Sequence, residues 1–128
     1  MPVSDVDAAK AFYTDQAGFV VDHDSDFGGG NRVVQLTPRG SGCSIVFGRG
    51  AVPEMAPGSL RGLQLVVPDV RAARAELLSR GVDVTEVQVA GREGFRPAQA
   101  GDDLHNVGFV FFADPDGNTW AVQQINGR

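Results

Sequence analysis

The chain has a single cysteine, Cys43, among 128 residues, so it cannot form an intrachain disulfide or a metal site made of cysteines alone. A protein without disulfides suits a reducing compartment, and we therefore expect a cytoplasmic location. Because Cys43 precedes a mostly apolar run, 44–47, we expect it to be a small buried residue rather than a nucleophile. Only two histidines are present, His23 and His105, and no Ser-His-Asp or Cys-His order stands out.

Basic residues are scarce. Eleven Lys and Arg face sixteen Asp and Glu, which gives a net charge of −5. Nucleic acids and anionic membranes both require a basic face, so neither is expected as a partner. No apolar run approaches the ~20 residues that span a bilayer. The first residues, 1–5, already have the pattern of structured sequence, so we expect no signal peptide. A small molecule is the expected partner.

The sequence contains an internal repeat. Asp5–Ala11 (DVDAAKA) recurs 64 residues later as Asp69–Ala75 (DVRAARA). Each copy continues as a helical pattern and then reaches a glycine followed by a β-rich run, at 18–21 and at 81–84. A period of this length indicates two similar modules rather than two unrelated halves.

A second repeated segment supports the division into two modules. The turn at 38–40 (PRG) resembles the turn at 115–117 (PDG), and each leads into an apolar segment. We therefore expect one domain made of two modules, about 1–50 and 60–128, joined by a linker at 51–59. Since neither module can bury a full core alone, they are expected to pack together and to bind a ligand in the groove between them.

Each copy of the repeat is expected to form an amphipathic helix. Ser4, with Asp7 three residues later, resembles a helix N-cap, and the glycine at 18 supplies the C-terminal stop. The second helix begins at Asp69 and ends before Gly81. Apolar and alternating runs predict strands at 19–23, 32–37, 43–47, 60–67, 82–89, 107–113 and 119–125.

The first module has no complete leading strand. The second module follows the order βαβββ, whereas the first begins with Pro2 and Val3 alone before its helix. We expect a first strand that is short or missing, whether through the start assignment, truncation or a genuine stub. The glycine-rich segment 26–31 is interpreted as a hairpin turn, because it lacks the strand-then-helix context of a phosphate loop. The irregular stretch 90–106 is either a binding loop or an edge connection.

Two segments resemble a known family. Residues 2–13 (PVSDVDAAKAFY) with Gly18 and Phe19 resemble the first helix of the glyoxalase/bleomycin-resistance/dioxygenase (vicinal oxygen chelate) superfamily, and residues 111–120 (FFADPDGNTW) resemble its last hairpin. The resemblance implies an α+β fold of two βαβββ modules, with cupped mixed sheets and helices outside. It also implies a homodimer, because such half-barrels commonly close their grooves against a partner copy.

The enzymes of that superfamily hold a divalent metal with about four His, Glu or Gln side chains on inward-facing strand positions. The resemblance places three of these positions on Gly62, on Ala121, and on Ser44 or Ile45; the fourth falls in the absent leading strand. None is a usual metal ligand. Moving by one residue brings in Leu63, Trp120 or Val122, which are not ligands either. We predict no metal and no other cofactor.

Other metal ligands remain an alternative. His23 lies between Asp22 and Asp24 and would bind a metal together with Asp26, while His105 follows two aspartates. A solvated acidic strand end explains both clusters more simply. Trp120 alternates with the groove position at 121, so it is expected to face the helices. The groove candidates for ligand binding are Gln35, Ser44, Gln64, Phe95, His105, Phe109, Phe111, Ala121 and Gln123.

Three functions compete. The first is a metal-free protein that binds a small organic molecule, similar to the bleomycin-resistance branch. The second is a metal-dependent lyase or a ring-cleaving, extradiol-type dioxygenase of the glyoxalase type. The third is a structural or regulatory dimer. The empty ligand positions favour the first, and the catalytic residues and the substrate stay undefined.

Overall fold

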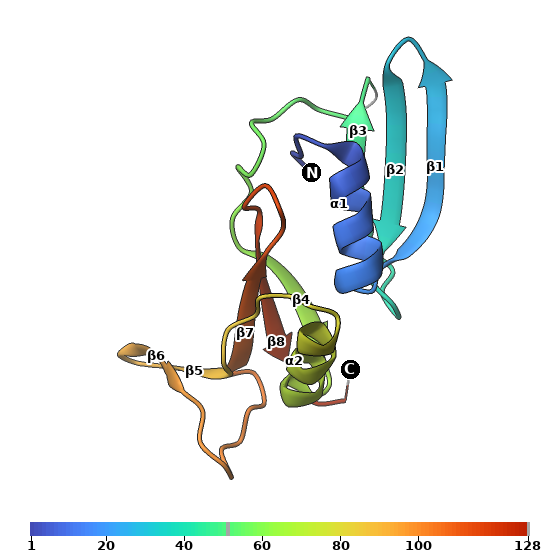
Figure 1. Cartoon of the computed structure of the whole chain (residues 1–128). Helices are drawn as coiled ribbons and strands as arrows, with labels where there is room; N and C mark the ends of the chain where they lie inside the picture. Colours follow the sequence, from blue (N-terminus) through green and yellow to red (C-terminus); the bar gives the residue numbers. More distant parts are fainter. Residues whose placement is uncertain (51, 128) are drawn as a thin grey trace. The chain divides into compact units, whose positions relative to one another are not determined.

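The computed structural model describes residues 1–50 and 52–127, and a helical segment followed by antiparallel strands occurs twice along the chain (Figure 1). It divides into two compact units. Unit 1 comprises Met1–Leu60 and Asp114–Asn118, and unit 2 comprises Arg61–Ala113 with the stretch that starts at Thr119. The first residue of the predicted linker, Ala51, lies outside the described residues.

Unit 1 has helical segments on one face of a three-stranded antiparallel sheet with the order β1-β2-β3. Its elements are α1 (Val6–Ala11), the π-helix η1 (Phe12–Gln16), β1 (Val20–Gly28), β2 (Asn31–Thr37) and β3 (Ile45–Arg49). Val34, Leu36 and Phe47 point from the sheet into the core and are fully buried. The Tyr13 ring from η1 packs on them, with its centroid 6.2 Å from that of Phe47.

The expected stub of the leading strand lies beside β3. The N-terminal ammonium of Met1 donates a hydrogen bond to the carbonyl of Val46 at 3.0 Å, but residues 1–3 do not form a strand. The sheet of unit 1 therefore lacks the parallel strand that unit 2 possesses.

Unit 2 is the complete module. Its elements are β4 (Leu63–Val67), α2 (Val70–Ser79), β5 (Gln88–Gly91), β6 (Gly94–Pro97), β7 (Gly108–Ala113) and β8 (Thr119–Gln124). The sheet order is β4-β8-β7-β5-β6, with β4 parallel to β8 and the other pairs antiparallel. Val110, Val122 and Trp120 are buried on the face that α2 covers, and the Trp120 ring stacks on Phe112 at 6.2 Å. Trp120 faces the helix side, as expected.

The helix ends follow the repeat, with one correction. Asp69 caps α2 by accepting a hydrogen bond from the Ala72 amide at 3.1 Å. In α1 the same position, Asp5, accepts from the Ala8 amide at 3.1 Å, so the prediction of Ser4 as the N-cap is wrong. Gly18 and Gly81 follow the two helical segments at φ 77° and 83°, as the stop signal requires.

Instead of capping α1, the Ser4 side chain binds the turn between β7 and β8. Its hydroxyl donates to a carboxylate oxygen of Asp116 at 2.6 Å. This contact joins the N-terminal segment to the turn between β7 and β8, and Asp114–Asn118 belongs with that segment to unit 1.

That turn contains a buried polar cluster. Asn118 is fully buried, and its side-chain amide donates to the Pro2 carbonyl and to the Asp114 carboxylate, both at 2.8 Å. Its Oδ1 accepts from the Leu60 amide at 3.1 Å, and Asp114 accepts from the Tyr13 hydroxyl at 2.8 Å. Each of these buried groups is thus paired, as burial requires.

Several strand boundaries differ from the predictions. β1 continues to Gly28, five residues beyond the predicted end at 23, and β4 begins at Leu63 instead of at 60. The expected strand 82–89 is a strand only from Gln88, although Val82, Val84 and Val87 are buried. The Phe111 amide donates to the side-chain Oγ1 of Thr85 at 3.0 Å instead of to a ladder carbonyl, so the pairing there is irregular. The stretch 90–106, expected to be irregular, contains β6, which pairs with β5 as a hairpin.

Cys43 corrects another expectation. The residue is exposed, because it lies in the loop before β3 and not in the strand, which starts at Ile45. The α+β fold with two helices and two cupped sheets is confirmed. Among the described residues, no helix has both the length and the apolar character needed to cross a membrane.

Candidate functional site

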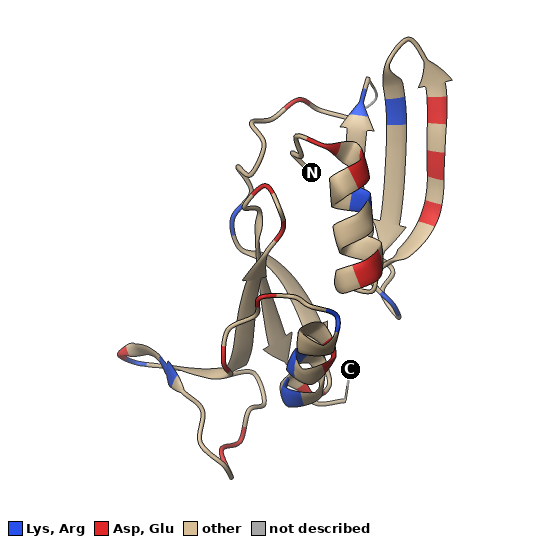
Figure 2. Ribbon diagram, viewed as in Figure 1, with Lys and Arg blue, Asp and Glu red and all other residues tan. Residues whose placement is uncertain are grey.

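The face of the unit 2 sheet that points away from α2 carries no charged strand residue. Strand alternation and the observed pairing define its members. We call this the amide–aromatic face; it consists of Gln64, Val66, Gln88, Ala90, Phe95, Pro97, Phe109, Phe111, Ala113, Thr119, Ala121 and Gln123. In Figure 2 the ribbons of β4, β7 and β8 show no charged residue, although 21% of the chain is charged.

Three phenylalanines form the apolar part of this face. Phe109 and Phe111 lie two residues apart on β7, so they share a face, and their rings are parallel within 4° with centroids 6.0 Å apart. Phe95 comes from β6, where it pairs with Ala90. Its ring meets the other two edge-on, at 5.6 Å from Phe109 and 5.2 Å from Phe111. Phe95 is 53% exposed, so the cluster presents an aromatic surface that a ligand can cover.

Two glutamines form the polar part. The side-chain nitrogen of Gln123 donates to the backbone carbonyl of Asn106 at 2.8 Å. The side-chain nitrogen of Gln64 donates to the Oε1 of Gln123. Ala121 pairs with Gln64 on one side and with Phe111 on the other, so a small residue separates the amides from the rings.

Six of the nine predicted groove residues therefore share one face: Gln64, Phe95, Phe109, Phe111, Ala121 and Gln123. The remaining three lie elsewhere. Gln35 is on β2 and Ser44 is exposed in the loop before β3, both in unit 1. His105 is exposed in the loop before β7, and its Nδ1 accepts a hydrogen bond from the Asn126 amide at 3.0 Å. Ligand contact by all nine stays a prediction.

The corresponding face of unit 1 mixes polar and aliphatic side chains. The face that points away from α1 carries His23, Ser25, Gln35 and Thr37 together with the valines at 20, 33 and 46. At a bulge in β1, Asp22 accepts hydrogen bonds from the Thr37 hydroxyl at 2.5 Å and from the Gln35 amide at 3.5 Å. We call this the mixed face of unit 1.

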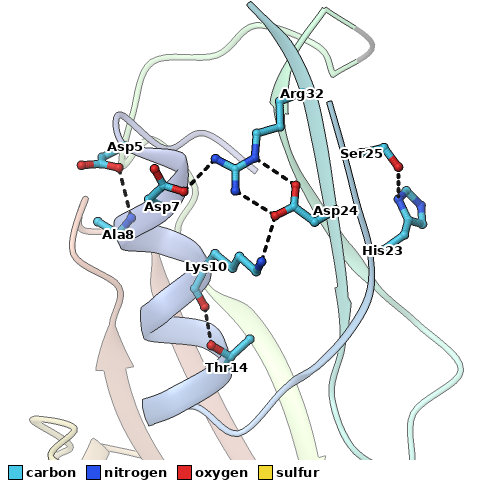
Figure 3. Close-up of polar contacts among 9 residues, drawn as sticks. All are labelled: Asp5, Asp7, Ala8, Lys10, Thr14, His23, Asp24, Ser25 and Arg32. Carbon is cyan, nitrogen blue, oxygen red and sulfur yellow. Dashed lines mark hydrogen bonds and ion pairs between the residues drawn. The ribbon is translucent and has the colours of Figure 1, made fainter. Parts of the chain in front are cut away.

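The helix side of the unit 1 sheet holds a paired charge cluster (Figure 3). Arg32 donates to Asp24 at 2.8 and 2.9 Å and to Asp7 at 2.7 Å, while Lys10 donates to Asp24 at 2.8 Å. Hydrogen bonds from Arg32 and then Lys10 hold the pKa of Asp24 far below its usual range, and those from Asp24 and Asp7 raise the pKa of Arg32. The cluster joins α1 to β1 and β2, and its charges are mutually neutralised.

The residues do not fit the metal site of the superfamily's enzymes. Of the positions that the resemblance assigned, Gly62 and Ala121 carry no ligand atom, and the Ser44 hydroxyl is not a usual ligand. Asp26 accepts from the Gly28 amide at 2.8 Å, and in Figure 3 His23 lies on the opposite side of β1 from Asp24. Within residues 1–50 and 52–127, no three His, Cys, Asp or Glu side chains are grouped to hold a metal ion. The expected lack of a metal stays a prediction.

The family follows from the comparison with known proteins. The family model of the Glyoxalase/Bleomycin resistance protein/Dioxygenase superfamily matches residues 1–122, and the chain belongs to this superfamily. No curated protein matches the chain at a significant level.

Several solved structures are similar over almost the whole chain. TnmS3, an antibiotic binding protein from Streptomyces sp. CB03234, is 35% identical with a TM-score of 0.71, covering 98% of this chain and 91% of TnmS3. A glyoxalase/bleomycin resistance protein from the same strain is 35% identical with a TM-score of 0.70, over 97% and 95% of the two chains. A superfamily member from Sphaerobacter thermophilus DSM 20745 is 26% identical with a TM-score of 0.71, over 97% and 91%.

Proposed function

We propose that this protein binds an uncharged small organic molecule with aromatic rings, and that it does so without the metal of its enzymatic relatives. The observation that carries the proposal is the cluster of Phe95, Phe109 and Phe111 on a sheet face without charged residues. The binding surface is the amide–aromatic face of unit 2.

Because the amide–aromatic face carries no charged strand residue, it favours an uncharged ligand. A ligand ring that packs on these phenylalanines gains about 0.5–1.5 kcal/mol for each aromatic pair beyond the area that it buries. A charged group would lose its hydration on this face and would meet no ion of opposite sign there. The glutamine amides offer hydrogen bonds that orient a neutral molecule.

The relatives support a ligand of this kind. TnmS3 is described as an antibiotic binding protein and shares 35% of its aligned residues with this chain. We propose that the natural ligand here is also a small antibiotic-like natural product. Two further expectations belong to the same proposal: the protein acts in the cytoplasm, as its single cysteine suggests, and it does so as a homodimer, as the resemblance to the family implies.

The alternative is a metal-dependent lyase or dioxygenase. Catalysis of that type needs a cation with open coordination positions, and we find no grouped ligands for it in the described residues. Stoichiometric nickel, zinc, manganese or iron in the purified protein would favour this alternative over the binding function.

The proposal is tested by removing one exposed phenylalanine from each unit. The variant Phe95→Ala removes the outermost ring of the cluster, and Phe27→Ala removes a ring that is 69% exposed in the β1–β2 hairpin of unit 1. With 2-naphthol as the probe, we expect Phe95→Ala to weaken binding about tenfold, since the ligand loses the exposed ring on which it would pack and the area that it would bury there. Phe27→Ala should bind as the unaltered protein does.

Calorimetric titration measures both variants. Equal weakening in the two would show that the effect is not specific to the amide–aromatic face. Stronger binding of anionic naphthalene-2-sulfonate than of 2-naphthol would contradict the expected preference for an uncharged ligand.

A further inference from the structure

We propose that the backbone carbonyl of Asn106 fixes the orientation of two glutamine amides, and that it thereby selects ligands that carry a hydrogen-bond donor on their edge. This inference rests on the proposed function and deepens it. It concerns the specificity of the site, and the residues that carry it are Asn106, Gln123 and Gln64.

The first link is the Asn106 carbonyl. Asn106 has a left-handed backbone with φ 64°, and its amide donates to the Gln124 carbonyl at 2.8 Å. The peptide is therefore tied to the end of β8. A carbonyl oxygen can only accept a hydrogen bond, so the side chain that faces it must present its nitrogen.

The second link is Gln123. Its Nε2 lies 2.8 Å from the Asn106 carbonyl, so its Oε1 points the other way, toward Gln64. That oxygen also can only accept, and Gln64 must present its own Nε2 to it. The Asn106 carbonyl thus orients the Gln123 amide, and the Gln123 amide in turn orients that of Gln64.

The last group is the Oε1 of Gln64. It accepts no hydrogen bond from a described residue, and the Gln64 side chain is exposed. Turning the amide over to present nitrogen instead would place two oxygens against each other at Gln123. The free oxygen lies on the same face as the phenylalanines, with Ala121 between them. A ligand that covers the rings and carries a hydroxyl or N–H on its edge satisfies this acceptor.

A pair of probes isolates this effect. 2-Naphthol can donate a hydrogen bond, whereas 2-methoxynaphthalene has the same ring system and can only accept one. We expect the unaltered protein to bind 2-naphthol more tightly than its methyl ether by about fivefold, the size expected from one hydrogen bond. Calorimetric titration gives the ratio of the two dissociation constants.

Variants then identify the source of the preference. Gln64→Met removes the acceptor, and Gln123→Met leaves the Gln64 amide free to turn, so in both the ratio should fall close to one. Gln88→Met is the matched control. Gln88 lies on the same face but outside the chain of amides, its Nε2 donating to the Glu86 carbonyl at 3.4 Å. If Gln88→Met changes the affinity, we expect it to do so equally for both probes, so that the ratio of their dissociation constants stays at about five.

The outcomes separate this inference from the function on which it rests. If both probes bind equally well and Phe95→Ala weakens both, the binding face stands and the selection by oriented amides is overturned. If Gln123→Met keeps the fivefold preference, Asn106 does not control Gln64 and the inference is again overturned. If neither probe binds the unaltered protein, the proposed function fails and the inference fails with it.

Discussion

The two units share a sequence repeat but differ in what their sheets present on the side away from the helix. Unit 1 presents a mixture of valines and polar side chains, among them Asp22, whose carboxylate accepts hydrogen bonds from Gln35 and Thr37. Unit 2 presents phenylalanines and glutamines without a charged strand residue. The repeat therefore preserves the capped helices and the helix-side core, while the opposite faces have diverged.

The difference also concerns how each unit is held together. In unit 1, ion pairs among Asp7, Lys10, Asp24 and Arg32 join the helix to the sheet, and a buried polar turn joins it to the N-terminal segment. Unit 2 packs α2 on apolar side chains of β7 and β8. Both units thus have an apolar core between helix and sheet, and unit 1 adds ion pairs to it.

The largest expected effect comes from the buried turn of unit 1. Asn118→Ala leaves the Leu60 amide and the Pro2 carbonyl without their partners, and we expect the free energy of unfolding to fall by about 3 kcal/mol. The control is a variant in the turn at 38–41, whose sequence resembles that of the turn at 115–118. Ser41 occupies the equivalent position and is exposed; its hydroxyl accepts from the Cys43 amide at 3.0 Å and donates to the Cys43 carbonyl at 3.3 Å, so Ser41→Ala should cost at most about 0.5 kcal/mol.

Urea unfolding measures both variants. A similar loss of stability in the two would contradict the view that the Asp114–Asn118 turn is a specific buried cluster of unit 1 and not an ordinary reverse turn.

A smaller effect is expected from the charge cluster, and it depends on pH. Arg32 and Lys10 lower the pKa of Asp24 in the folded protein, so the stability that ionised Asp24 provides is present above the pKa of an unfolded aspartate, about 3.9. It is lost as the pH falls below that value toward the folded pKa. At pH 7 we expect Asp24→Asn to cost about 1 kcal/mol, because the pairs are partly exposed, and at pH 3 the cost should shrink.

Unit 2 provides the comparison for this prediction. Asp102 pairs with Arg96 at 3.0 Å, and its pKa is lowered as well, but the Arg96 side chain is 53% exposed and the pair ties the following loop only to the edge strand β6. Urea unfolding of Asp102→Asn at the two pH values should show a smaller change than Asp24→Asn at pH 7. The reverse order would show that unit 1 does not depend on its charges more than unit 2 does.

Much of the fold followed from local signals in the sequence. The repeat, the glycine stops at 18 and 81, and the two-residue alternation of β7 and β8 predicted both helices and the side on which Trp120 and Ala121 lie. Alternation also brought Gln64 and Gln123 to one face, because a strand repeats its faces every second residue.

Other features depended on partners distant in sequence. The β5–β6 hairpin was missed because all four residues of β6 are exposed and show no alternation. Ser4 was mistaken for a cap because its partner, Asp116, lies at the other end of the chain. The relation among Asn106, Gln123 and Gln64 depends on a loop backbone that no local pattern of the sequence describes.

The most direct test of the account is a map of where an aromatic ligand binds. In a titration of isotope-labelled protein with 2-naphthol, followed by backbone amide chemical shifts, we expect saturable shifts concentrated on β4, β6, β7 and β8 around Phe95, Phe111 and Ala121. Shifts confined to the mixed face of unit 1, around Gln35 and Thr37, or no saturable shifts at all, would contradict the assignment of ligand binding to the amide–aromatic face.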